Sequence, residues 1–293
     1  MRVLVTGGTG FIGSHLIREL VDRGRDVVTI SRRSAPPLPF VEHHALDIED
    51  PAVQDVAERA DAIVHLAASS DASSSFANPF LYSRTNALGT LNVLEAARRS
   101  NALFVFASSQ RIYRPQKWPV DEDAPKRPVD PYGYSKLIGE HWVQMHHQIY
   151  DLRTVVLRFF SVYGPGQTLQ SGTSGVVTIF VRRAMQGEEL TVNDGNLRDF
   201  TYVGDVVKGI VLALDKPAAI GQTYNIATGE STSIETLART VKEIAKSTSS
   251  IVVKGTGDEE SYVADIARAR SELGYQPSVD LRRGLELYVE HLK

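Results

Sequence analysis

The chain has 293 residues, a formal net charge of −3, 42% hydrophobic residues and 23% charged residues. This is the mix of a globular protein, and it gives no general attraction to nucleic acid or to an anionic membrane. The absence of cysteine excludes disulfides, a thiolate nucleophile and a cysteine-based zinc site. We find neither a membrane-spanning window nor a signal-peptide pattern, so we expect a cytoplasmic protein.

The chain opens with a strand, a glycine turn and a helix. Arg2–Thr6 is an apolar run, and Ser14–Arg23 has helical periodicity. Between them, Gly7 permits a tight turn, Gly10 lets the backbone approach a pyrophosphate, and Gly13 lets the helix pack on the strand. The helix N-terminus then faces the phosphates. This context predicts dinucleotide binding, and a purely structural glycine turn is the alternative.

The end of the second predicted strand, Asp26–Ile30, bears on which dinucleotide binds. Enzymes that use NAD usually place a carboxylate there for the ribose 2′-hydroxyl. This chain has Ser31-Arg32-Arg33 instead. A guanidinium matches the oxygens of a 2′-phosphate, so the pattern favours NADP over NAD. The alternative is that both arginines are solvated loop charges.

Strands and helices alternate through the rest of the first half, which predicts a parallel, doubly wound α/β sheet. Ligands of such sheets bind beyond the carboxyl ends of the strands. One strand ends His65-Leu66-Ala67-Ala68, where small residues leave room for a flat cofactor, and Ser108 and Ser109 end a later strand at the same edge. Ser69–Asn78 reads as a polar loop over the site. The remaining predicted strands are Glu42–Leu46, Asp61–Leu66, Leu103–Ala107 and Val155–Phe160, and the helices are Pro51–Arg59 and Asn86–Arg99.

Tyr132 and Lys136 are the candidate catalytic pair. Asp130 is a good helix N-cap and Pro131 suits the first helical position, so Tyr132 and Lys136 lie on one helical face. A nearby ammonium lowers the pKa of a phenol, and three units of lowering require about 4 kcal/mol. Such a tyrosine can take a hydroxyl proton while hydride leaves the same carbon. The alternative is an ordinary amphipathic helix start.

The second half predicts a smaller, interleaved C-terminal part. We expect a dinucleotide-binding domain from 1–160 and 201–227, a substrate-binding domain from 161–200 and 228–293, and the site in the cleft between them. The histidine pairs at 43–44 and 146–147 lack metal-ligand spacing, so we expect no metal. Gln167–Gly175 reads as a polar loop. The predicted elements are Val176–Gln186, Leu190–Asn193, Asp205–Leu214, Thr223–Ala227, Ile234–Lys246, Asp265–Leu273 and Leu281–Leu292.

Several motifs in order resemble the extended short-chain dehydrogenase/reductase family, in its nucleotide-sugar epimerase/dehydratase branch, and in particular its UDP-glucose 4-epimerase-like members. The resemblance covers nearly the whole chain. The motifs that carry it are Thr6-Gly-Gly-Thr-Gly-Phe-Ile-Gly13, His65-Leu-Ala-Ala68, Asn86-Ala-Leu-Gly-Thr90, Ser108-Ser109, Tyr132-x-x-x-Lys136, Arg158-Phe-Phe-Ser-Val-Tyr-Gly-Pro-Gly-Gln167, Arg198-Asp-Phe-Thr-Tyr-Val203 and Tyr224-Asn-Ile-Ala-Thr-Gly229.

The resemblance implies a role for each matching residue. Ser109 would be the catalytic serine, Tyr132 the base or acid, and Lys136 the residue that holds the nicotinamide ribose. Arg198 would contact the phosphates of the sugar nucleotide. The substrate-binding set is Ser109, Ser161, Arg198 and Asp258. The cofactor-binding set is Gly7, Gly10, Phe11, Ile12, Gly13, Ser31, Arg32, Arg33, Asp47, Ile48, Leu66, Ala67, Ala68, Asn86, Tyr132, Lys136, Phe159 and Phe160.

Three departures from the family pattern affect the expected reaction. Gln110 and Arg111 stand where the 4,6-dehydratases carry an Asp-Glu pair, which argues against elimination and against decarboxylation. Ser161 replaces the usual asparagine. The late Arg-x-Gly-Asp motif reads Gly255-Thr-Gly-Asp258, so its arginine is absent, although Lys254 adjoins it.

The expected function is a nucleotide-sugar 4-epimerase of the UDP-glucose/UDP-galactose type. It would work through a transient 4-keto sugar and a bound nicotinamide that is regenerated in each cycle. The alternative is an NADP-dependent reductase or dehydrogenase of a nucleotide sugar or another carbonyl substrate. A non-catalytic nicotinamide sensor is disfavoured because the Ser, Tyr and Lys are all present. We also expect a homodimer that pairs the helices at Asn86–Arg99 and Tyr132–Tyr150, which could equally pack only within the monomer.

Overall fold

The computed structural model describes residues 1–34, 36, 38–116, 118–167, 175–193, 195–255 and 261–293. The predicted substrate residue Asp258 lies outside this set. So does most of the predicted loop Gln167–Gly175.

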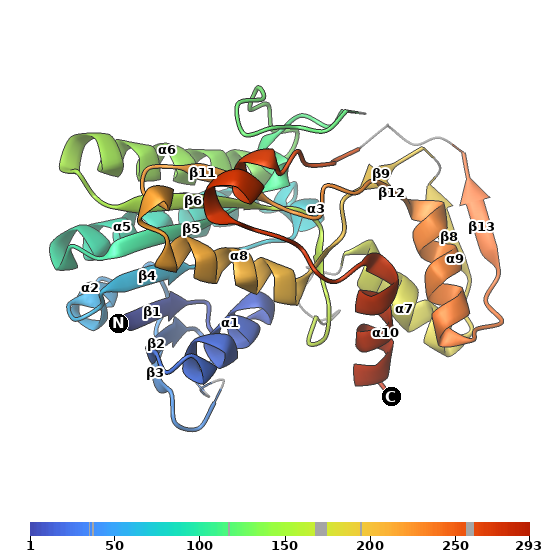
Figure 1. Ribbon diagram of the computed structural model, residues 1–293, viewed down its shortest axis with the longest axis horizontal. Coiled ribbons are helices and arrows are strands. Elements are labelled where there is room, and N and C mark those ends of the chain that lie inside the picture. Colours follow the sequence, from blue (N-terminus) through green and yellow to red (C-terminus); the bar gives the residue numbers. More distant parts are fainter. Residues whose placement is uncertain (35, 37, 117, 168–174, 194, 256–260) are drawn as a thin grey trace.

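A seven-stranded parallel sheet forms the larger part of the molecule (Figure 1), as the alternating strands and helices predict. Its order is β11-β6-β5-β4-β1-β2-β3. Thr6 at the end of β1 pairs with Ile30 on one side and His65 on the other, so the carboxyl ends of the strands meet at one edge. The strands are β1 (Arg2–Thr6), β2 (Asp26–Ser31), β3 (Glu42–Ala45), β4 (Ala62–His65), β5 (Leu103–Ser109), β6 (Thr154–Phe159) and β11 (Thr223–Ile226).

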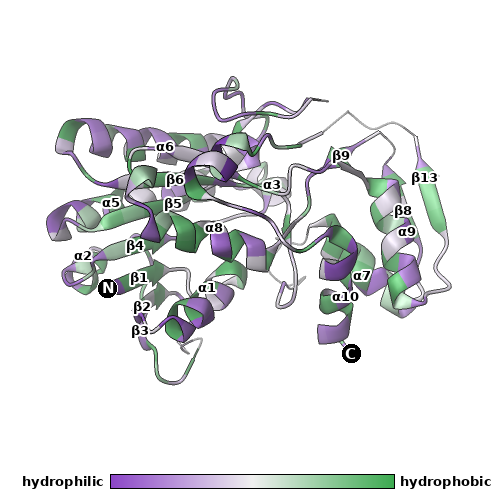
Figure 2. Cartoon of the chain, viewed as in Figure 1, coloured by the Kyte–Doolittle hydropathy of each residue, from purple (hydrophilic) through white to green (hydrophobic). Residues whose placement is uncertain are grey.

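Helices cover both faces of this sheet because its strands are apolar on both sides. Val3 and Val5 of β1 enter a core with α1 and α8, whereas Leu4 enters a second core with α2, α5 and α6. Figure 2 shows the central strands as largely hydrophobic and the covering helices as two-sided. The helices are α1 (Phe11–Asp22), α2 (Val53–Ala57), α5 (Gly89–Ser100), α6 (Pro131–Tyr150) and α8 (Val203–Asp215).

A smaller part, at the right in Figure 1, has its own hydrophobic cluster. It contains α7 (Val176–Gln186), α9 (Ile234–Ala245) and α10 (Leu281–His291), and β8 (Leu190–Asn193) pairs in parallel with β13 (Ile251–Lys254). Two short sheets adjoin it: β7 (Val162–Tyr163) with β10 (Thr201–Tyr202), and β9 (Leu197–Arg198) with β12 (Thr232–Ser233). The segment around Tyr262 and Leu273 packs into the first core of the large part. The exact division into two domains stays a prediction.

Several local predictions differ from the structure. The predicted loop Ser69–Asn78 contains α3 (Ala72–Ser75), because the Asp71 side chain accepts a hydrogen bond from the Ser73 N–H and caps it. The predicted helix Asn86–Arg99 begins inside a π-helical stretch, Ser83–Leu88, which follows α4 (Pro79–Tyr82), and it is α-helical only from Gly89. The predicted helix Asp265–Leu273 is π-helical over Ala269–Leu273, and short 3₁₀ turns form at Gln110–Ile112 and Pro217–Ala219. None of the helices in the described part of the chain has the length and apolarity to cross a membrane.

Candidate active site

The glycine turn forms a cradle at the N-terminus of α1. Gly7 has a φ of +73°, and a Cβ there would lie 2.8 Å from the Ala67 nitrogen. A Cβ on Gly13 would lie 2.3 Å from the Gly7 oxygen. At Gly10, by contrast, a Cβ would meet only that oxygen, at 3.0 Å, among the described residues. Gly7 and Gly13 are therefore required by packing, whereas Gly10 leaves space above the turn for a phosphate group.

The helix behind this cradle begins at Phe11, and Gly10 is its N-cap. The N–H groups of its first turn, which includes Ile12, have no partner within the helix and favour an anion. The predicted cofactor residues Gly7, Gly10, Phe11, Ile12 and Gly13 thus come together in one turn. Their arrangement fits the pyrophosphate of a dinucleotide.

Ser31 and the two arginines follow directly at the end of β2. The Thr9 hydroxyl of the glycine turn donates to the Ser31 hydroxyl at 2.8 Å. Arg33 Nη1 donates to the Thr9 carbonyl oxygen at 3.1 Å. The turn therefore holds Ser31 and Arg33 beside the cradle, on the side where β2 ends. Arg32 is exposed.

The end of β4 is fixed to the neighbouring strand and helix. The N–H of Leu66 donates to the Thr6 oxygen, and that of Ala67 to the Thr6 hydroxyl, both at 3.2 Å. Beyond Ala68, the Asn86 side chain exchanges two 2.8 Å hydrogen bonds with the Ser69 backbone. Asn86 is completely buried, so it positions the loop after β4.

Asp47 and Ile48 lie after β3, at the other edge of the predicted cofactor site. Asp47 Oδ1 accepts the N–H of Glu49 at 3.0 Å, and the Ile48 oxygen accepts from Asn92 Nδ2 at 2.8 Å. The Ile48 side chain is 4% exposed and packs in the second core. Its role in this structure is to pack against the helix layer.

Ser109 and Tyr132 meet at the carboxyl end of β5. The Ser109 hydroxyl lies near the Tyr132 phenol and acts to lower its pKa, and Ser109 also accepts the N–H of Arg111 at 3.2 Å. The predicted helix start is confirmed: Asp130 Oδ1 accepts the N–H of Gly133 at 2.7 Å, with Pro131 at the first position. This cap sets the first turn of α6, which carries Tyr132 to the end of the sheet.

Lys136 is buried one turn further along α6. Its Nζ donates to the Ala107 oxygen of β5 at 2.9 Å and lies 5.0 Å from the centre of the Phe106 ring. Burial lowers the pKa of Lys136 to about 8, although the charge of Glu140 acts in the opposite direction. The lysine therefore stays cationic at neutral pH and is closely tied to the strand that carries Ser109.

The acidity of Tyr132 differs from the prediction. Burial raises the pKa of Tyr132 to about 12, while the Ser109 hydroxyl and the charge of Arg111 act to lower it. The expected lowering by Lys136 is thus wrong for the protein chain by itself, because the sequence does not reveal how deeply the phenol is buried. In this state Tyr132 is a phenol, which is ready to donate a proton.

His65 is a functional-site neighbour that the sequence argument did not single out. It is fully buried between the Thr6 hydroxyl, 2.7 Å from Nδ1, and the Thr90 hydroxyl, 3.0 Å from Nε2. Burial, and secondarily the charge of Lys136, lower the pKa of His65 to about 3. A neutral imidazole therefore links β1, β4 and α5 beneath the site. Its position in the His65-Leu-Ala-Ala68 motif is the only sequence signal for it.

Phe159 is the last residue of β6, next to β5, and Phe160 and Ser161 follow it. Phe159 is in register with Ser109 and is 8% exposed, so it lies at the predicted edge. Phe160 is fully buried and packs against Tyr113 with ring centres 6.2 Å apart. Ser161 has a φ of +23°, and its hydroxyl accepts from Gln110 at 3.3 Å. The chain bends at this serine as it enters β7.

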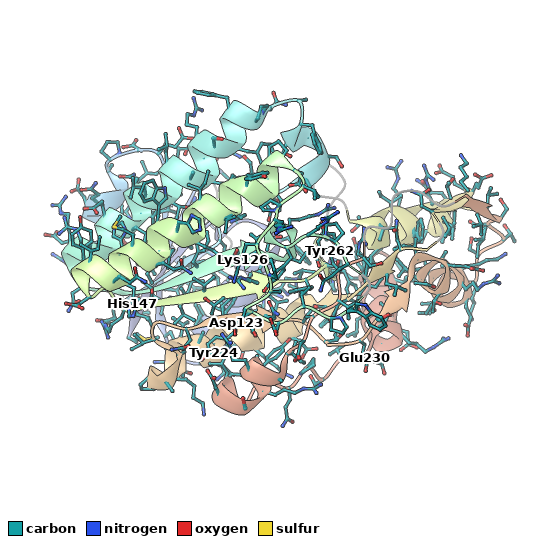
Figure 3. The ribbon with its side chains drawn as sticks, turned by 90° about the horizontal axis from the view of Figure 1, so that it is seen from above. Asp123, Lys126, His147, Tyr224, Glu230 and Tyr262 are labelled. Carbon is teal, nitrogen blue, oxygen red and sulfur yellow. The ribbon has the colours of Figure 1, made fainter. Side chains whose placement is uncertain are left out.

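Arg198 reaches the same region from β9. Its Cζ lies 5.3 Å from the centre of the Tyr262 ring, and Arg111 Cζ lies 5.2 Å from that centre. Tyr262 lies where the large part meets the smaller one (Figure 3). The sequence argument treated Arg111 only as a departure from a motif, and it did not identify Tyr262 at all.

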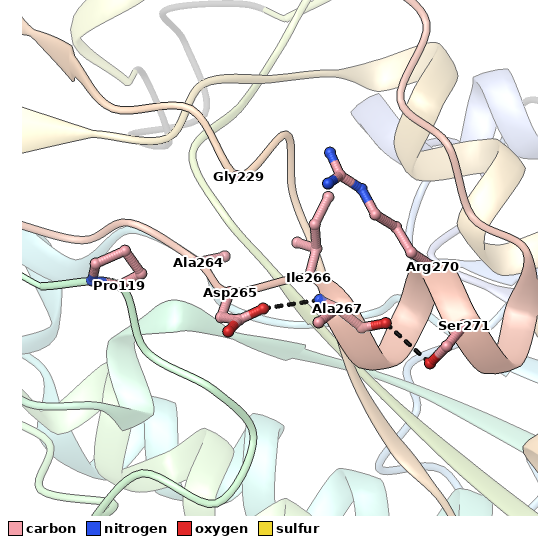
Figure 4. Close-up of a pocket in the computed structure, with 8 residues that line it drawn as sticks. All are labelled: Pro119, Gly229, Ala264, Asp265, Ile266, Ala267, Arg270 and Ser271. Atoms are coloured by element: carbon pink, nitrogen blue, oxygen red, sulfur yellow. Dashed lines mark hydrogen bonds between the residues drawn. The ribbon is translucent and has the colours of Figure 1, made fainter.

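A separate surface hollow lies along the C-terminal segment, and it contains none of the predicted site residues (Figure 4). Within it, the N–H of Ala267 donates to Asp265 and the hydroxyl of Ser271 donates to the Ala267 oxygen. These polar groups are used in local turns. The hollow is lined by Pro119, Gly229, Ala264, Asp265, Ile266, Ala267, Arg270 and Ser271. Among the described residues, no group of three or more His, Asp or Glu side chains is arranged to hold a metal ion.

Comparisons with known proteins agree with this geometry. Residues 3–227 match the model of the NAD dependent epimerase/dehydratase family. A putative UDP-glucose 4-epimerase of Methanocaldococcus jannaschii is 35% identical over 310 residues, which cover 99% of this chain and 98% of that protein.

Solved structures show the same fold over the full length. The UDP-glucose 4-epimerase of Thermotoga maritima, solved with UDP-glucose, is 33% identical with a TM-score of 0.93, covering 100% of this chain and 98% of that one. The UDP-glucuronic acid 4-epimerase of Bacillus cereus, solved with UDP-glucuronic acid and NAD, is 29% identical with a TM-score of 0.91, covering 100% and 99%. Other relatives are named UDP-glucuronic acid decarboxylases.

Proposed function

Because this chain belongs to the NAD dependent epimerase/dehydratase family, we propose that it is a nucleotide-sugar 4-epimerase of the UDP-glucose/UDP-galactose type. The observation that carries the proposal is the proximity of Ser109, at the end of β5, to the Tyr132 phenol, whose pKa it lowers, with Lys136 buried one helical turn away. Gln110 and Arg111 follow the serine, so no carboxylate stands there to assist elimination or decarboxylation.

Each of the three residues has a distinct task in this proposal. The Ser109 hydroxyl orients the oxygen on carbon 4 of the sugar. Tyr132 takes the proton of that hydroxyl group when the 4-keto sugar forms and returns it when the keto group is reduced. The positive charge of Arg111 and the neighbouring Ser109 hydroxyl favour the proton-accepting form of Tyr132 in the first step. A bound nicotinamide supplies the hydride acceptor and donor for carbon 4.

The remaining predicted residues would hold the ligands. The turn containing Gly7, Gly10 and Gly13 holds the pyrophosphate of the dinucleotide, and Arg198 pairs with the diphosphate of the sugar nucleotide. Ser161 borders the sugar, beside Gln110. The predicted two-domain division places this substrate between the sheet and the smaller part.

A preference for NADP rests on one specific contact. Arg33 donates to Thr9 of the glycine turn, which places a guanidinium beside the end of β2, where the ribose of a dinucleotide is expected. This contact also favours the second candidate function, an NADP-dependent reductase with the same Ser, Tyr and Lys. Replacing Arg32 and Arg33 together by alanine should weaken NADP binding and leave NAD binding nearly unchanged.

We also propose a homodimer through α5 and α6. Tyr134 and Ile138 are four residues apart on α6 and are 56% and 39% exposed, and Leu88 before α5 is 59% exposed. Exposed apolar side chains on these neighbouring helices favour association. Sedimentation equilibrium of the wild type and of Ile138→Asp tests it: a monomeric wild type contradicts the dimer.

The deciding experiment incubates the purified protein with UDP-galactose, without added cofactor and then with NAD or NADP. UDP-glucose and reduced nicotinamide are assayed together. UDP-glucose that forms without net reduced cofactor supports the epimerase, whereas stoichiometric reduced cofactor supports the reductase.

Matched variants connect this activity to the site. Tyr132→Phe removes only the phenolic hydroxyl and should lower kcat at least about 100-fold. Tyr134→Phe, an exposed tyrosine on the same helix, is the control and should retain activity. A fully active Tyr132→Phe variant would rule out the proposed proton transfer.

A further inference from the structure

Two guanidinium groups from distant segments stack on one buried tyrosine ring. Arg111 comes from the short turn after β5, Arg198 from β9, and Tyr262 from the segment beyond β13. Tyr262 is 1% exposed. Its backbone is fixed to the Arg198 segment, because its N–H donates to the Leu197 oxygen and its oxygen accepts the Asp199 N–H, both at 3.0 Å. The Tyr262 ring therefore holds Arg111, from the large part, and Arg198 close to the same point.

The Asp199 side chain ties the backbone next to Tyr262 to a further segment. Its carboxylate is fully buried and accepts hydrogen bonds from the N–H groups of Thr228 and Gly229, at 2.9 and 2.8 Å. A longer contact, 3.4 Å, joins it to the N–H of Ala264, two residues after Tyr262. Backbone hydrogen bonds among three segments thus hold the Tyr262 ring in place, so its position is preorganised before a ligand binds.

Arg111 is also linked to the reacting groups. Its backbone N–H donates to Ser109 Oγ, and its Nη1 lies 3.4 Å from Asp130 Oδ2. Asp130 caps the helix turn that contains Tyr132. Arg111 therefore adjoins the end of the site that contains Ser109 and Tyr132. Its side chain remains 24% exposed, so a ligand can reach it.

We propose that Arg111 recognises a carboxylate on the sugar ring carbon next to the reacting one, so that the enzyme prefers a nucleotide-linked uronic acid to a neutral hexose. This inference rests on the 4-epimerase reaction proposed above, and it replaces the neutral hexose of that proposal by the corresponding uronic acid as the preferred substrate. If Ser109 and Tyr132 hold the oxygen on carbon 4, the substituent of carbon 5 lies one bond further along the ring. A guanidinium forms two parallel, charge-assisted hydrogen bonds with a carboxylate, whereas a hydroxymethyl group offers it one neutral hydroxyl.

The diphosphate of the substrate is the other anion that Arg111 could bind, next to Arg198. The contacts with Ser109 and Asp130 favour the sugar end, because both residues adjoin Tyr132. The two anions predict different results. A carboxylate partner affects only the acidic substrate, whereas a diphosphate partner affects every nucleotide sugar equally.

The test compares kcat/KM for UDP-glucuronic acid and UDP-glucose in the wild type and in Arg111→Gln. We expect the wild type to favour the acidic substrate. In Arg111→Gln, the ratio of the two kcat/KM values should fall about 10- to 100-fold, which is the size of a lost hydrogen bond to a charged group. Loss of Arg111 also changes the pKa of Tyr132, but that change affects both substrates equally and so cancels in this ratio. Arg111→Lys should restore part of it.

Arg114→Gln is the matched control, because Arg114 is exposed and lies three residues further on, and its ratio should not change. Arg198→Gln should lower kcat/KM for both substrates by the same factor, because both carry the diphosphate. An unchanged ratio in Arg111→Gln, or a wild type that prefers UDP-glucose, overturns the proposal. Thermal unfolding of each variant shows whether it folds.

Equilibrium binding separates this inference from the proposed function. Calorimetric titration of the wild type and Arg111→Gln with each nucleotide sugar reports recognition without turnover. Selective loss of UDP-glucuronic acid binding in the variant supports the carboxylate contact even if no epimerisation occurs, whereas equal loss for both ligands refutes it.

Discussion

Arg158 and Glu140 form a two-point ion pair in the interior, with 2.9 Å between Arg158 Nε and Glu140 Oε1 and 2.7 Å between Nη2 and Oε2. Their side chains are 2% and 1% exposed. Ser108 also donates to Glu140 Oε1 at 2.5 Å. Because Glu140 lies one turn after Lys136 on α6, this pair fixes the helix that carries Tyr132 and Lys136 to β5 and β6.

Removing one member of the pair should destabilise the protein strongly. Glu140→Gln leaves the buried Arg158 without its counter-charge, and we expect the free energy of unfolding to fall by about 3–5 kcal/mol. Urea unfolding measures this loss. The double variant Glu140→Leu/Arg158→Met should be more stable than Glu140→Leu alone, because it leaves no uncompensated charge. Losses that simply add in the double variant would contradict the coupling.

The burial of Lys136 should lower the free energy of unfolding at neutral pH. Its pKa falls from 10.5 to about 8 on burial, so the unfolded chain binds more protons between these values. The penalty, about 3 kcal/mol, is fully present below pH 8 and disappears as the pH approaches 10.5. Lys136→Met should therefore raise the free energy of unfolding at pH 7, by less than this amount because the bond to Ala107 is lost. Urea unfolding at pH 7 and pH 10 should show the gain shrinking at the higher pH, and a gain independent of pH would refute this explanation.

His65 should make the fold sensitive to acid. Its pKa falls from 6.5 to about 3 on burial, so below pH 6.5 the unfolded chain binds a proton at this residue that the folded protein does not. The free energy of unfolding is therefore unaffected above pH 6.5. It falls by up to about 5 kcal/mol as the pH approaches 3. His65→Gln keeps polar atoms between Thr6 and Thr90 but does not titrate. We expect the stability of the variant to decline less between pH 6.5 and pH 4 in urea unfolding. Parallel pH profiles for the two proteins would argue against a buried neutral imidazole.

The two glycines of the cradle should respond differently to alanine. Gly10→Ala adds a Cβ that meets only the Gly7 oxygen, at 3.0 Å, and occupies the space above the turn. We expect NAD affinity to fall at least about 10-fold with little change in stability. Gly13→Ala places its Cβ 2.3 Å from the same oxygen and should cost about 1–3 kcal/mol of folding stability. Fluorescence titration with NADH and urea unfolding distinguish the two, and unchanged affinity in Gly10→Ala would contradict the phosphate cradle.

Local sequence patterns were sufficient for the sheet and the helix that carries the tyrosine. The alternation of apolar strands and amphipathic helices predicts the parallel sheet because each pattern reflects how one segment buries its own side chains. The Asp130-Pro131 cap and the bounds Val176–Gln186 of α7 are likewise confirmed by the structure. The strand β13 was not predicted, although Ile251-Val252-Val253 is a β-branched run. Its partner β8 lies about sixty residues earlier in the chain.

The sequence by itself determined the family and the parallel α/β fold, and it predicted the segments of the candidate site, because these depend on short-range periodicity and motif spacing. Only the tertiary structure decided the pKa values of the site residues and which distant residues contact them. Burial sets the pKa of Tyr132 at about 12, against the lowering expected from Lys136. The contact of Arg111 and Arg198 with Tyr262 joins segments far apart in the chain. Desolvation and long-range packing depend on the whole fold, so no local pattern encodes them.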